Sequence, residues 1–203
     1  MKRLIDIIIS LIALILLSPV FLYVALKVRK NLGSPIFYLQ ARPGKNGKIF
    51  KMIKFRSMKN AFDVHGNPLP DDQRITPFGH KLRATTLDEM PQLLNVLKGD
   101  MSIVGPRPQL CEFMEHYTPH QMRRHEVKPG MTGLAQVSGR NHLSWEEKFD
   151  LDVKYVETYS VLFDFKIMFK TVLVMIKKEG INAHDQEVGA TRFTSHDSIK
   201  NDE

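Results

Sequence analysis

The feature that most constrains this chain is an apolar stretch near its N-terminus, residues 7–26, which spans 20 residues and contains no charged side chain. As one straight helix it would be about 30 Å long, which is enough to cross the hydrocarbon core of a bilayer. The stretch is long for a secretory signal peptide, no cleavage site of small residues follows it, and Lys27, Arg29 and Lys30 close it. We therefore expect residues 1–30 to form a membrane element.

A serine and a proline inside this stretch, Ser18 and Pro19, argue against a simple spanning helix. Pro19 has no N–H to donate to the carbonyl of Ile15, so the helix should bend there. The Ser18 hydroxyl can bond back to the carbonyl of Leu14, which helps such a break to persist in lipid. Basic residues flank both ends of the stretch, which favours both ends on the cytoplasmic side. The prediction is a broken, re-entrant helix, with a spanning helix as the alternative.

A pair of adjacent acids, Asp88 and Glu89, lies between Arg83 and Arg107 at the predicted start of a helix. One interpretation is helix capping, because Thr86-x-x-Glu89 matches a capping box and acids are favoured in a first helical turn. Asp88 is the alternative N-cap. Prolines on both sides of Arg107 restrict the backbone there, which suits an arginine that must hold one direction. Capping and a chemical role both remain open at this point.

A basic β-hairpin is expected between the membrane element and the acid pair. It consists of a short strand over 35–39, a glycine-containing turn over 42–47 and a second strand over 49–55. Lys54 and Arg56 share one face of the second strand, so they could together bind a phosphate, although solvated surface charge is the default for such a run. The polar residues 60–77 are expected to form a long loop.

The second half of the chain is expected to be mainly helical. A capping box at Ser144-x-x-Glu147 predicts a helix, and Asp152 falls on its apolar face, so this acid is either half-exposed or directed into a site. Residues 161–176 are strongly apolar, and a buried core helix and a helix in the membrane interface remain equally open. His116 and His120 are four residues apart, but Pro119 lies between them, so a metal site there is not expected.

The composition allows one basic domain of 203 residues with net charge +7. A basic balance suits a phosphorylated substrate, nucleic acid or an anionic membrane surface. The single cysteine, Cys111, excludes an internal disulfide. We expect an α+β fold with three parts: a re-entrant membrane helix over 1–30, a domain with a small hairpin and several helices, some of them interfacial and amphipathic, over 31–180, and a polar, loosely ordered tail over 181–203.

Taken together, these segments resemble the bacterial sugar transferase family, the small monotopic polyprenyl-phosphate phosphoglycosyl transferases. The matching segments are the basic-flanked apolar N-terminus, ARPGKNGKIFKMIKFRSM, LDEMPQLLNVLKGDMSIVGPRP, HEVKPGMTGLAQVSGRN and DLDVKYVETYS. They extend from about residue 2 to residue 180, and the block around the acid pair is the most specific of them. One departure is Leu134, where relatives usually carry tryptophan.

The resemblance implies the transfer of a sugar-1-phosphate from a UDP-sugar to a polyprenyl phosphate such as undecaprenyl phosphate, with release of UMP. It implies a ping-pong mechanism through a covalent aspartyl-phosphosugar, at the cytoplasmic face of the bacterial inner membrane. The reaction would be the first membrane step of glycan assembly for a glycoprotein, an exopolysaccharide or O-antigen, with downstream glycosyltransferases as partners. For relatives of this length the expected donor carries an N-acetylated amino sugar such as diacetylated bacillosamine.

The resemblance also implies roles for individual residues. Asp88 matches the nucleophile, and Glu89 its neighbour, which helps to hold Mg²⁺. Asp152 matches a recurring acid of the family and is expected to serve the site, and Gln136 and Arg140 match a segment expected near the nucleotide. From their positive charge, Arg83, Arg107 and Lys54 are expected to contact phosphate.

The chemistry of the acid pair agrees with this assignment. An ordinary aspartate, with a pKa near 3.9, is ionised at pH 7 and needs no general base to attack phosphorus. Cations remove the repulsion between two anions, so the nearby arginines suit the reaction. The competing hypothesis, a membrane-tethered nucleic-acid-binding module without catalysis, leaves the acid pair and the proline-flanked arginine without a role.

Overall fold

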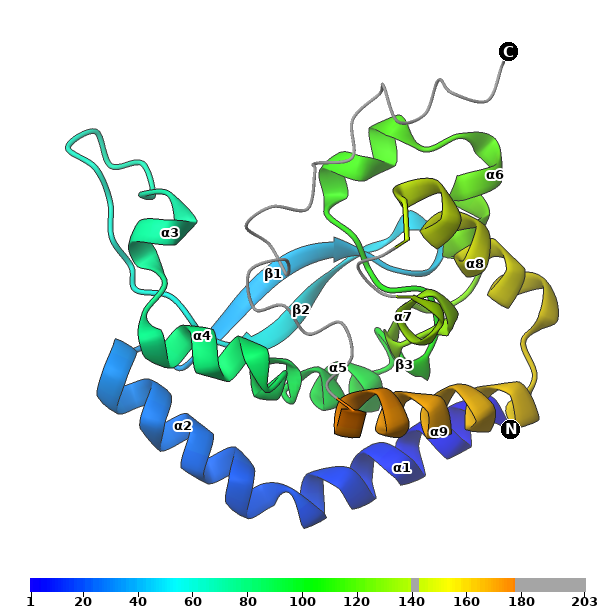
Figure 1. Cartoon of the computed structure of the whole chain (residues 1–203), viewed down its shortest axis with the longest axis horizontal. Coiled ribbons are helices and arrows are strands. Elements are labelled where there is room, and N and C mark those ends of the chain that lie inside the picture. The colour runs from blue at the N-terminus through cyan, green and yellow to red at the C-terminus, as the bar shows by residue number, and fades with distance from the viewer. Residues whose placement is uncertain (140–142, 178–203) are drawn as a thin grey trace.

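The computed structural model describes residues 1–139 and 143–177, in which helices and short strands are mixed, in agreement with the expected α+β class. Figure 1 labels the elements along the chain. The α-helices of this part are α1 (Lys2–Leu16), α2 (Ser18–Leu32), α3 (Asp71–Arg74), α4 (Pro77–Ala84), α5 (Gln92–Lys98), α6 (Pro119–Met122), α7 (Leu134–Ser138), α8 (Trp145–Thr158) and α9 (Val161–Lys177). The strands are β1 (Phe37–Pro43), β2 (Ile49–Phe55), β3 (Ser102–Val104) and β4 (Gly130–Thr132). Short 3-10 turns are η1 (Lys45–Gly47), η2 (Leu87–Glu89), η3 (Cys111–His116) and η4 (Arg123–Glu126).

The N-terminal apolar stretch forms two helices, α1 and α2, bent by 65° at the expected position. The Ser18 hydroxyl donates to the carbonyl of Ile15 at 2.8 Å and not to that of Leu14 as predicted. Pro19 has no N–H, so the carbonyl of Ile15 lacks its helical donor and accepts from Ser18 instead. By length and composition, no single helix among the described residues could cross a bilayer, whereas the bent pair taken together could.

Polar residues in the first two turns of α1 attach this helix to the rest of the protein. Arg3 donates to the carbonyls of Val96 and Leu97, at 2.5 and 2.7 Å, which are among the last carbonyls of α5. The buried Asp6 accepts hydrogen bonds from the Ser102 hydroxyl and the Ile103 amide of β3, both at 3.0 Å. The polar face of α1 therefore lies against the protein.

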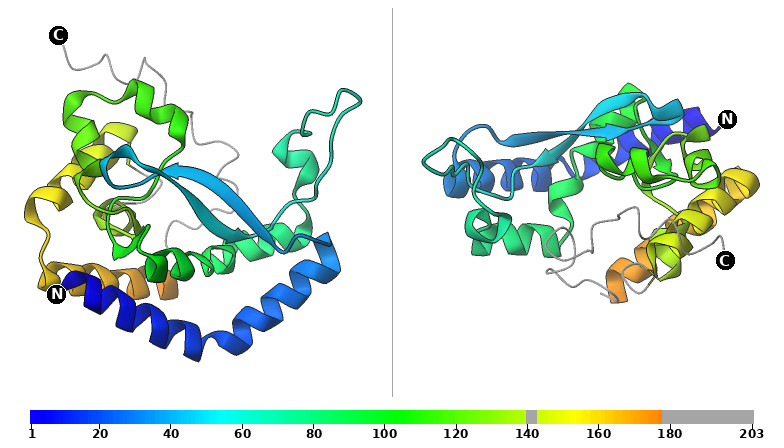
Figure 2. Two further views of the ribbon diagram at one scale, coloured as in Figure 1. Left: turned by 180° about the vertical axis from the view of Figure 1, so that it is seen from behind. Right: turned by 90° about the horizontal axis from the view of Figure 1, so that it is seen from above.

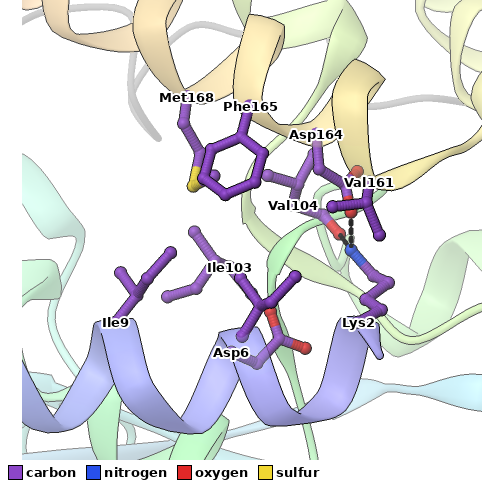
Figure 3. A pocket seen from close by; sticks show the side chains of 10 residues that line it. Lys2, Asp6, Ile9, Ile103, Val104, Val161, Asp164, Phe165 and Met168 are labelled. Carbon is purple, nitrogen blue, oxygen red and sulfur yellow. Dashed lines mark hydrogen bonds and ion pairs between the residues drawn. The ribbon is translucent and has the colours of Figure 1, made fainter.

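A second polar contact joins the start of α1 to α8 and α9. Lys2 forms an ion pair with Asp164 at 2.5 Å and also donates to the carbonyl of Val104 and to the Tyr155 hydroxyl. Figure 3 shows Lys2, Val104 and Asp164 at one end of a small pocket, which is otherwise lined by Asp6 and by apolar side chains from α1, β3 and α9. The N-terminal cations, expected to set membrane orientation, thus also hold three helices together.

Helix α2 returns to the same body at its C-terminal half. Val24 and Val28 are buried against Phe55 of β2, Leu82 of α4 and Met90. This cluster is the apolar core nearest to the acid pair, because Met90 follows Glu89 directly.

The position of Arg56 differs from the one predicted from the sequence. It donates to the carbonyls of Leu32 and Ser34, at the end of α2, and does not join Lys54 at a phosphate site. Because Arg56 lies one residue beyond the last residue of β2, tertiary contacts with the end of α2 determine its direction in place of the strand alternation.

The expected hairpin is present as an antiparallel pair in which Phe37 lies opposite Phe55 and Pro43 opposite Ile49. The second strand has the predicted bounds, whereas the first begins at Phe37 and includes the first two residues of the predicted turn, ending at Pro43. The side chain of Asn95 in α5 bonds the amide of Ile53 and the carbonyl of Lys51, which fixes α5 along the free edge of β2. Strands β3 and β4 form a separate parallel pair.

Three helices lie along one edge of the molecule, where Figures 1 and 2 show α1, α2 and α9 at the same level. Their exposed large apolar side chains include Leu4, Ile8, Leu11, Ile12, Ile15, Leu16, Val20, Leu22 and Leu26 on α1 and α2, and Leu162, Phe165, Phe169, Val172, Leu173 and Met175 on α9. Ile167 on the opposite side of α9 is buried. Helix α9 therefore has a buried face, in agreement with the core-helix alternative, and an exposed apolar face, while its place in a membrane interface stays a prediction.

Candidate active site

The acid pair lies in the short 3-10 turn η2, before the helix and not inside it. Thr86, in a left-handed conformation with φ 58°, makes no side-chain capping bond, and α5 begins only at Gln92 after Pro91. Both capping predictions, with Thr86 or with Asp88 as N-cap, are therefore wrong. Pro91 precedes the helix, where its missing N–H costs no helical bond, and the two carboxylates are left to interact with cations.

Glu89 is held by two cations that come from distant parts of the chain. Arg107 approaches it with both terminal nitrogens, Nη2 at 2.6 Å from Oε1 and Nη1 at 3.2 Å from Oε2. Lys54 Nζ lies 3.3 Å from the same Oε1. Burial alone would raise the pKa of Glu89, but Arg107 and Lys54 together lower that pKa well below its ordinary value. Glu89 is therefore ionised throughout the physiological range.

Asp88 has the opposite character although it is the adjacent residue. Burial and, next, the charge of Glu89 raise the pKa of Asp88 to about 6, while Lys54, Arg83 and Arg107 work against this rise. Its Oδ1 is buried and has no hydrogen-bond partner within the described part of the chain. At pH 7 Asp88 is thus mostly ionised, but less completely than an ordinary aspartate.

Arg83 reaches the site from the last turn of α4. Its Nε donates to the Ser57 hydroxyl at 3.0 Å, just beyond the end of β2. The helix can approach this segment because residue 79 is glycine: a Cβ there would lie 1.9 Å from the carbonyl oxygen of Ser57. Gly79 thus allows the close packing of α4 that directs Arg83 toward the acid pair.

The structure brings five of the predicted site residues together and places others elsewhere. The group formed by Asp88, Glu89, Lys54, Arg83 and Arg107, hereafter the acid–cation cluster, combines residues from β2, α4, η2 and the turn after β3. Asp152 is not part of this cluster.

Asp152 is almost completely buried and forms an ion pair with Arg124 at 2.6 Å. Burial raises the pKa of Asp152, and Arg124 opposes that rise. The sequence left two possibilities open for Asp152, partial exposure or a position directed into a site. Partial exposure is wrong, because Asp152 is buried and its carboxylate is directed at Arg124.

Gln136 lies in α7, where its side-chain amide donates to the carbonyl of Met131 at 3.1 Å. Its Oε1 is buried and has no hydrogen-bond partner among the described residues. Arg140 lies outside the described residues, as do the tail residues 181–203.

The sequence reasoning missed two residues that form hydrogen bonds with members of the cluster, Ser57 with Arg83 and Arg124 with the backbone of Arg107. Ser57 follows a basic strand and Arg124 stands in the charged run Arg123-Arg124-His125-Glu126, and neither belongs to a periodic pattern. A signal for Arg124 could have come from Asp152, since an acid on an apolar helix face requires a cation as partner.

The carboxylates of the cluster suit a magnesium ion in their chemistry. Mg²⁺ prefers carboxylate and phosphate oxygens and commonly takes only one or two carboxylates from the protein. Asp88 Oδ1 is a buried oxygen without a competing donor in the described part, and Glu89 supplies the adjacent carboxylate. No group of three histidine, cysteine or acidic residues that could hold a metal occurs in the described ranges. The remaining ligands of such an ion would therefore come from substrate and water.

Comparison with known proteins places the chain in a family. The family model for bacterial sugar transferases matches residues 1–178. The chain is 48% identical over 199 residues to an uncharacterized sugar transferase, EpsL, of Bacillus subtilis (strain 168), covering 98% of both chains. It is 41% identical to the exopolysaccharide production protein ExoY of Sinorhizobium fredii, covering 88% of this chain and 87% of that protein.

A longer relative has a more specific name. The undecaprenyl-phosphate galactose phosphotransferase of Salmonella typhimurium is 41% identical over 197 residues, which make up 89% of this chain but only 41% of that protein. The chain thus corresponds to less than half of the longer relative and to nearly the whole of EpsL. The match over nearly the full described length identifies the chain as an enzyme of the bacterial sugar transferase family.

Proposed function

We propose that this enzyme transfers a sugar-1-phosphate from a UDP-sugar to undecaprenyl phosphate and releases UMP. Relatives named for such reactions support the general reaction, among them the undecaprenyl-phosphate galactose phosphotransferase of Salmonella typhimurium and the UDP-glucose:undecaprenyl-phosphate glucose-1-phosphate transferase of Escherichia coli (strain K12). The observation that carries the proposal is the buried Asp88 carboxylate, with an oxygen that has no hydrogen-bond partner in the described chain, among three cations.

In the first step an oxygen of ionised Asp88 attacks the phosphorus that bears the sugar. The bond from this phosphorus to the bridging oxygen breaks, and UMP leaves with the electron pair. Lys54, Arg83 and Arg107 offset the charge of the diphosphate, and the pairing of Arg107 and Lys54 with Glu89 keeps those two cations directed at the site. Bound Mg²⁺ would supply further charge neutralisation at the phosphate oxygens, held by Asp88 and Glu89.

In the second step a phosphate oxygen of the lipid attacks the same phosphorus. The bond to the Asp88 oxygen breaks, which regenerates the carboxylate and forms the lipid diphosphosugar. The two substrates thus react in turn at a single carboxylate, which is ping-pong chemistry. No general base is required, because the attacking carboxylate and the lipid phosphate are both anions near neutral pH.

The helix pair supports a monotopic, re-entrant arrangement at the cytoplasmic face of the inner membrane. The first turn of α1 contacts α5 and α9, and the end of α2 contacts Arg56, so both outer ends of the pair are attached to one body. A spanning element would separate its two ends by a bilayer. The apolar side chains at the bend and on α9 would then enter the lipid, and the acceptor phosphate would lie at headgroup level near the cluster.

The identity of the sugar is a separate part of the proposal. The named relatives carry galactose or glucose in their names, whereas the resemblance to small transferases suggested an N-acetylated amino sugar. We retain the N-acetylated amino sugar as the donor to test first. A panel of UDP-hexoses and UDP-N-acetylhexosamines, with diacetylated bacillosamine included, assayed for UMP release would decide between them.

The central experiment compares the wild-type enzyme with Asp88→Asn in membranes supplied with UDP-sugar, Mg²⁺ and undecaprenyl phosphate. We expect UMP release from the wild type and a loss of at least about a thousandfold in the variant, because an amide is not a nucleophile. Mass spectrometry of enzyme incubated with donor alone should find a sugar-phosphate on the peptide that contains Asp88. Unchanged UMP release in Asp88→Asn would remove the nucleophile from this scheme.

A further inference from the structure

Arg124 is the most deeply buried cation of the described chain whose role the reaction scheme does not explain. It is 2% exposed, and its guanidinium lies over the rings of Tyr117 and Phe149, with centroids 5.5 and 5.2 Å away. Its Nε and Nη2 both donate to Asp152 Oδ2, at 3.1 and 2.6 Å, and its Nη1 donates to the Tyr117 hydroxyl at 2.8 Å. Burying a charge is costly unless it is paired and hydrogen-bonded. Asp152 and Tyr117 meet this requirement for Arg124.

One further hydrogen bond of Arg124 leads to the acid–cation cluster. Its Nη2 donates to the backbone carbonyl of Arg107 at 2.7 Å. The neighbouring carbonyls of this turn are also held, that of Pro106 by the Gly130 amide at 2.9 Å and that of Pro108 by Arg42 at 3.4 Å. Three consecutive carbonyls of the proline-flanked turn are therefore each bonded to a donor from a different part of the chain.

The side chain of Arg107 starts from this backbone and ends on both oxygens of Glu89. It is 37% exposed, so surrounding side chains hold it less tightly than they hold Glu89. Its direction therefore depends on the backbone from which it extends. A rotation of the peptide at Arg107 would move the guanidinium away from Glu89, and the bond from Arg124 opposes that rotation.

We propose that Arg124 is a positioning residue that holds the Arg107 backbone so that the Arg107 guanidinium stays on Glu89 beside Asp88. Arg124 acts through Arg107 and touches no substrate. Asp152 is then the counter-charge that keeps Arg124 in place, a role that replaces the substrate contact expected from its sequence. The proposal rests on the transfer reaction argued above, because it assigns Arg124 to the same site.

The proposal predicts that the effects of Arg124 and Arg107 on the rate are not independent. Lysine at position 124 keeps the positive charge opposite Asp152 but lacks the fork that can donate to Asp152, Tyr117 and Arg107 together. We expect Arg124→Lys to lower kcat by about 10- to 100-fold, with the KM for the UDP-sugar within about threefold of wild type. In an Arg107→Lys background the same change should cost less than about threefold more, because the group that it positions is already gone.

Two variants serve as matched controls. Arg123→Lys alters the neighbouring arginine, which is bonded to Glu126 and Glu157 at the surface, and should leave kcat and KM unchanged. Tyr117→Phe removes one partner of Arg124 but leaves its bond to Arg107, and should lower kcat by no more than about threefold. A merely structural role would lower the rates of Arg124→Lys and Tyr117→Phe in proportion to their loss of thermal stability.

Fully multiplicative effects of Arg124→Lys and Arg107→Lys on kcat would overturn the proposal, and so would a wild-type kcat in Arg124→Lys. If Arg124→Lys does not fold, Asp152→Asn takes its place in the same cycle. Melting temperatures of the two single variants and the double variant test the tie between Arg124 and Arg107 without turnover: additive shifts would refute it. An absence of UMP release by the wild type would refute the proposed function instead, so the two failures are distinguishable.

Discussion

At the scale of single residues, two adjacent carboxylates acquire different properties from their partners. Glu89 is bonded to Arg107 and Lys54, whereas Asp88 has a buried oxygen without a donor in the described chain and a pKa raised to about 6. A carboxylate that lacks hydrogen bonds is a better nucleophile than one saturated with them, because fewer interactions must break before it attacks. The difference between the two acids therefore separates a reactive group from a group that orders cations.

The raised pKa of Asp88 predicts the pH dependence of the first half-reaction. The nucleophile must be ionised, and the pKa of Asp88 in the free enzyme is about 6. We expect kcat/KM for the UDP-sugar to be level above pH 7 and to fall toward tenfold per pH unit below about pH 6. A profile measured from pH 5 to 8 that stays level down to pH 5 would contradict this assignment, provided the enzyme remains folded.

The same shift predicts that Asp88 lowers the stability of the enzyme. An acid whose folded-state pKa is raised from 3.8 to about 6 makes folding less favourable once it ionises, so its cost is complete above pH 6 and disappears as the pH falls toward 4. Asp88→Asn should therefore raise the melting temperature by several degrees at pH 7, for a gain of about 2–3 kcal/mol. The gain should shrink steadily between pH 6 and pH 4. A lower melting temperature for the variant at pH 7 would show that the charge stabilises the fold.

At the scale of elements, the cluster is assembled where a strand end, a helix end and two turns meet. Helix α4 supplies Arg83, strand β2 supplies Lys54, and the turn after β3 supplies Arg107. Each element is fixed by its own contact: α4 by its close approach at Gly79, β2 by Asn95 and the turn after β3 by Arg124. The geometry of the acid–cation cluster therefore depends on residues that lie outside the cluster.

Gly79 offers a direct test of the packing of α4. A methyl group at this position would lie 1.9 Å from the backbone oxygen of Ser57, so α4 must shift as a whole. We expect Gly79→Ala to lower the free energy of unfolding by about 2 kcal/mol or more, and to slow turnover by moving Arg83. Thermal unfolding and UMP release measure the two effects. His80→Ala, an exposed neighbour on the same helix, is the control, and equal stability of the two variants would contradict the close contact.

At the scale of the whole molecule, α1, α2 and α9 lie along one edge (Figure 1), and all three carry exposed large apolar side chains. Ion pairs and hydrogen bonds from Lys2, Arg3 and Asp6 attach α1 to the body that carries the cluster. A membrane element attached in this way would fix the height of the cluster above the membrane, because α1 makes these contacts itself, without a flexible linker. The proposed lipid substrate would require such a fixed height.

The break between α1 and α2 predicts the side on which the N-terminus lies. With the bend intact, we expect an N-terminal tag to be accessible only from the cytoplasmic side. Ser18→Ala combined with Pro19→Ala restores a helical donor for the carbonyl of Ile15, so the pair should straighten and some molecules should present the tag outside. Protease or label accessibility in sealed vesicles measures this, with Val20→Ala as control. A wild-type tag on the outside would contradict the re-entrant arrangement.

Features that depend on neighbouring residues could be predicted from the sequence. The bend at Ser18-Pro19, the bounds of β2 and the capping box at Ser144 all depend on hydrogen bonds within a few positions, and the structure confirms them. Asp88, Glu89 and Arg107 could be chosen as candidates at this level, because adjacent acids and a proline-flanked arginine are unusual enough to be noticed without coordinates.

Which of these groups contact one another depends on the packing of the whole chain. Glu89 and Arg107 are 18 positions apart and Asp152 and Arg124 are 28 apart, so their pairing depends on how η2, η4, α8 and the turn after β3 pack. The local capping motif at Thr86 does not form, and Glu89 pairs with distant cations instead. An unpaired buried carboxylate costs more free energy than a helix end without a cap. Hydrogen bonds between residues a few positions apart can be predicted from the local sequence, whereas the direction of a buried charged side chain depends on the three-dimensional arrangement around it.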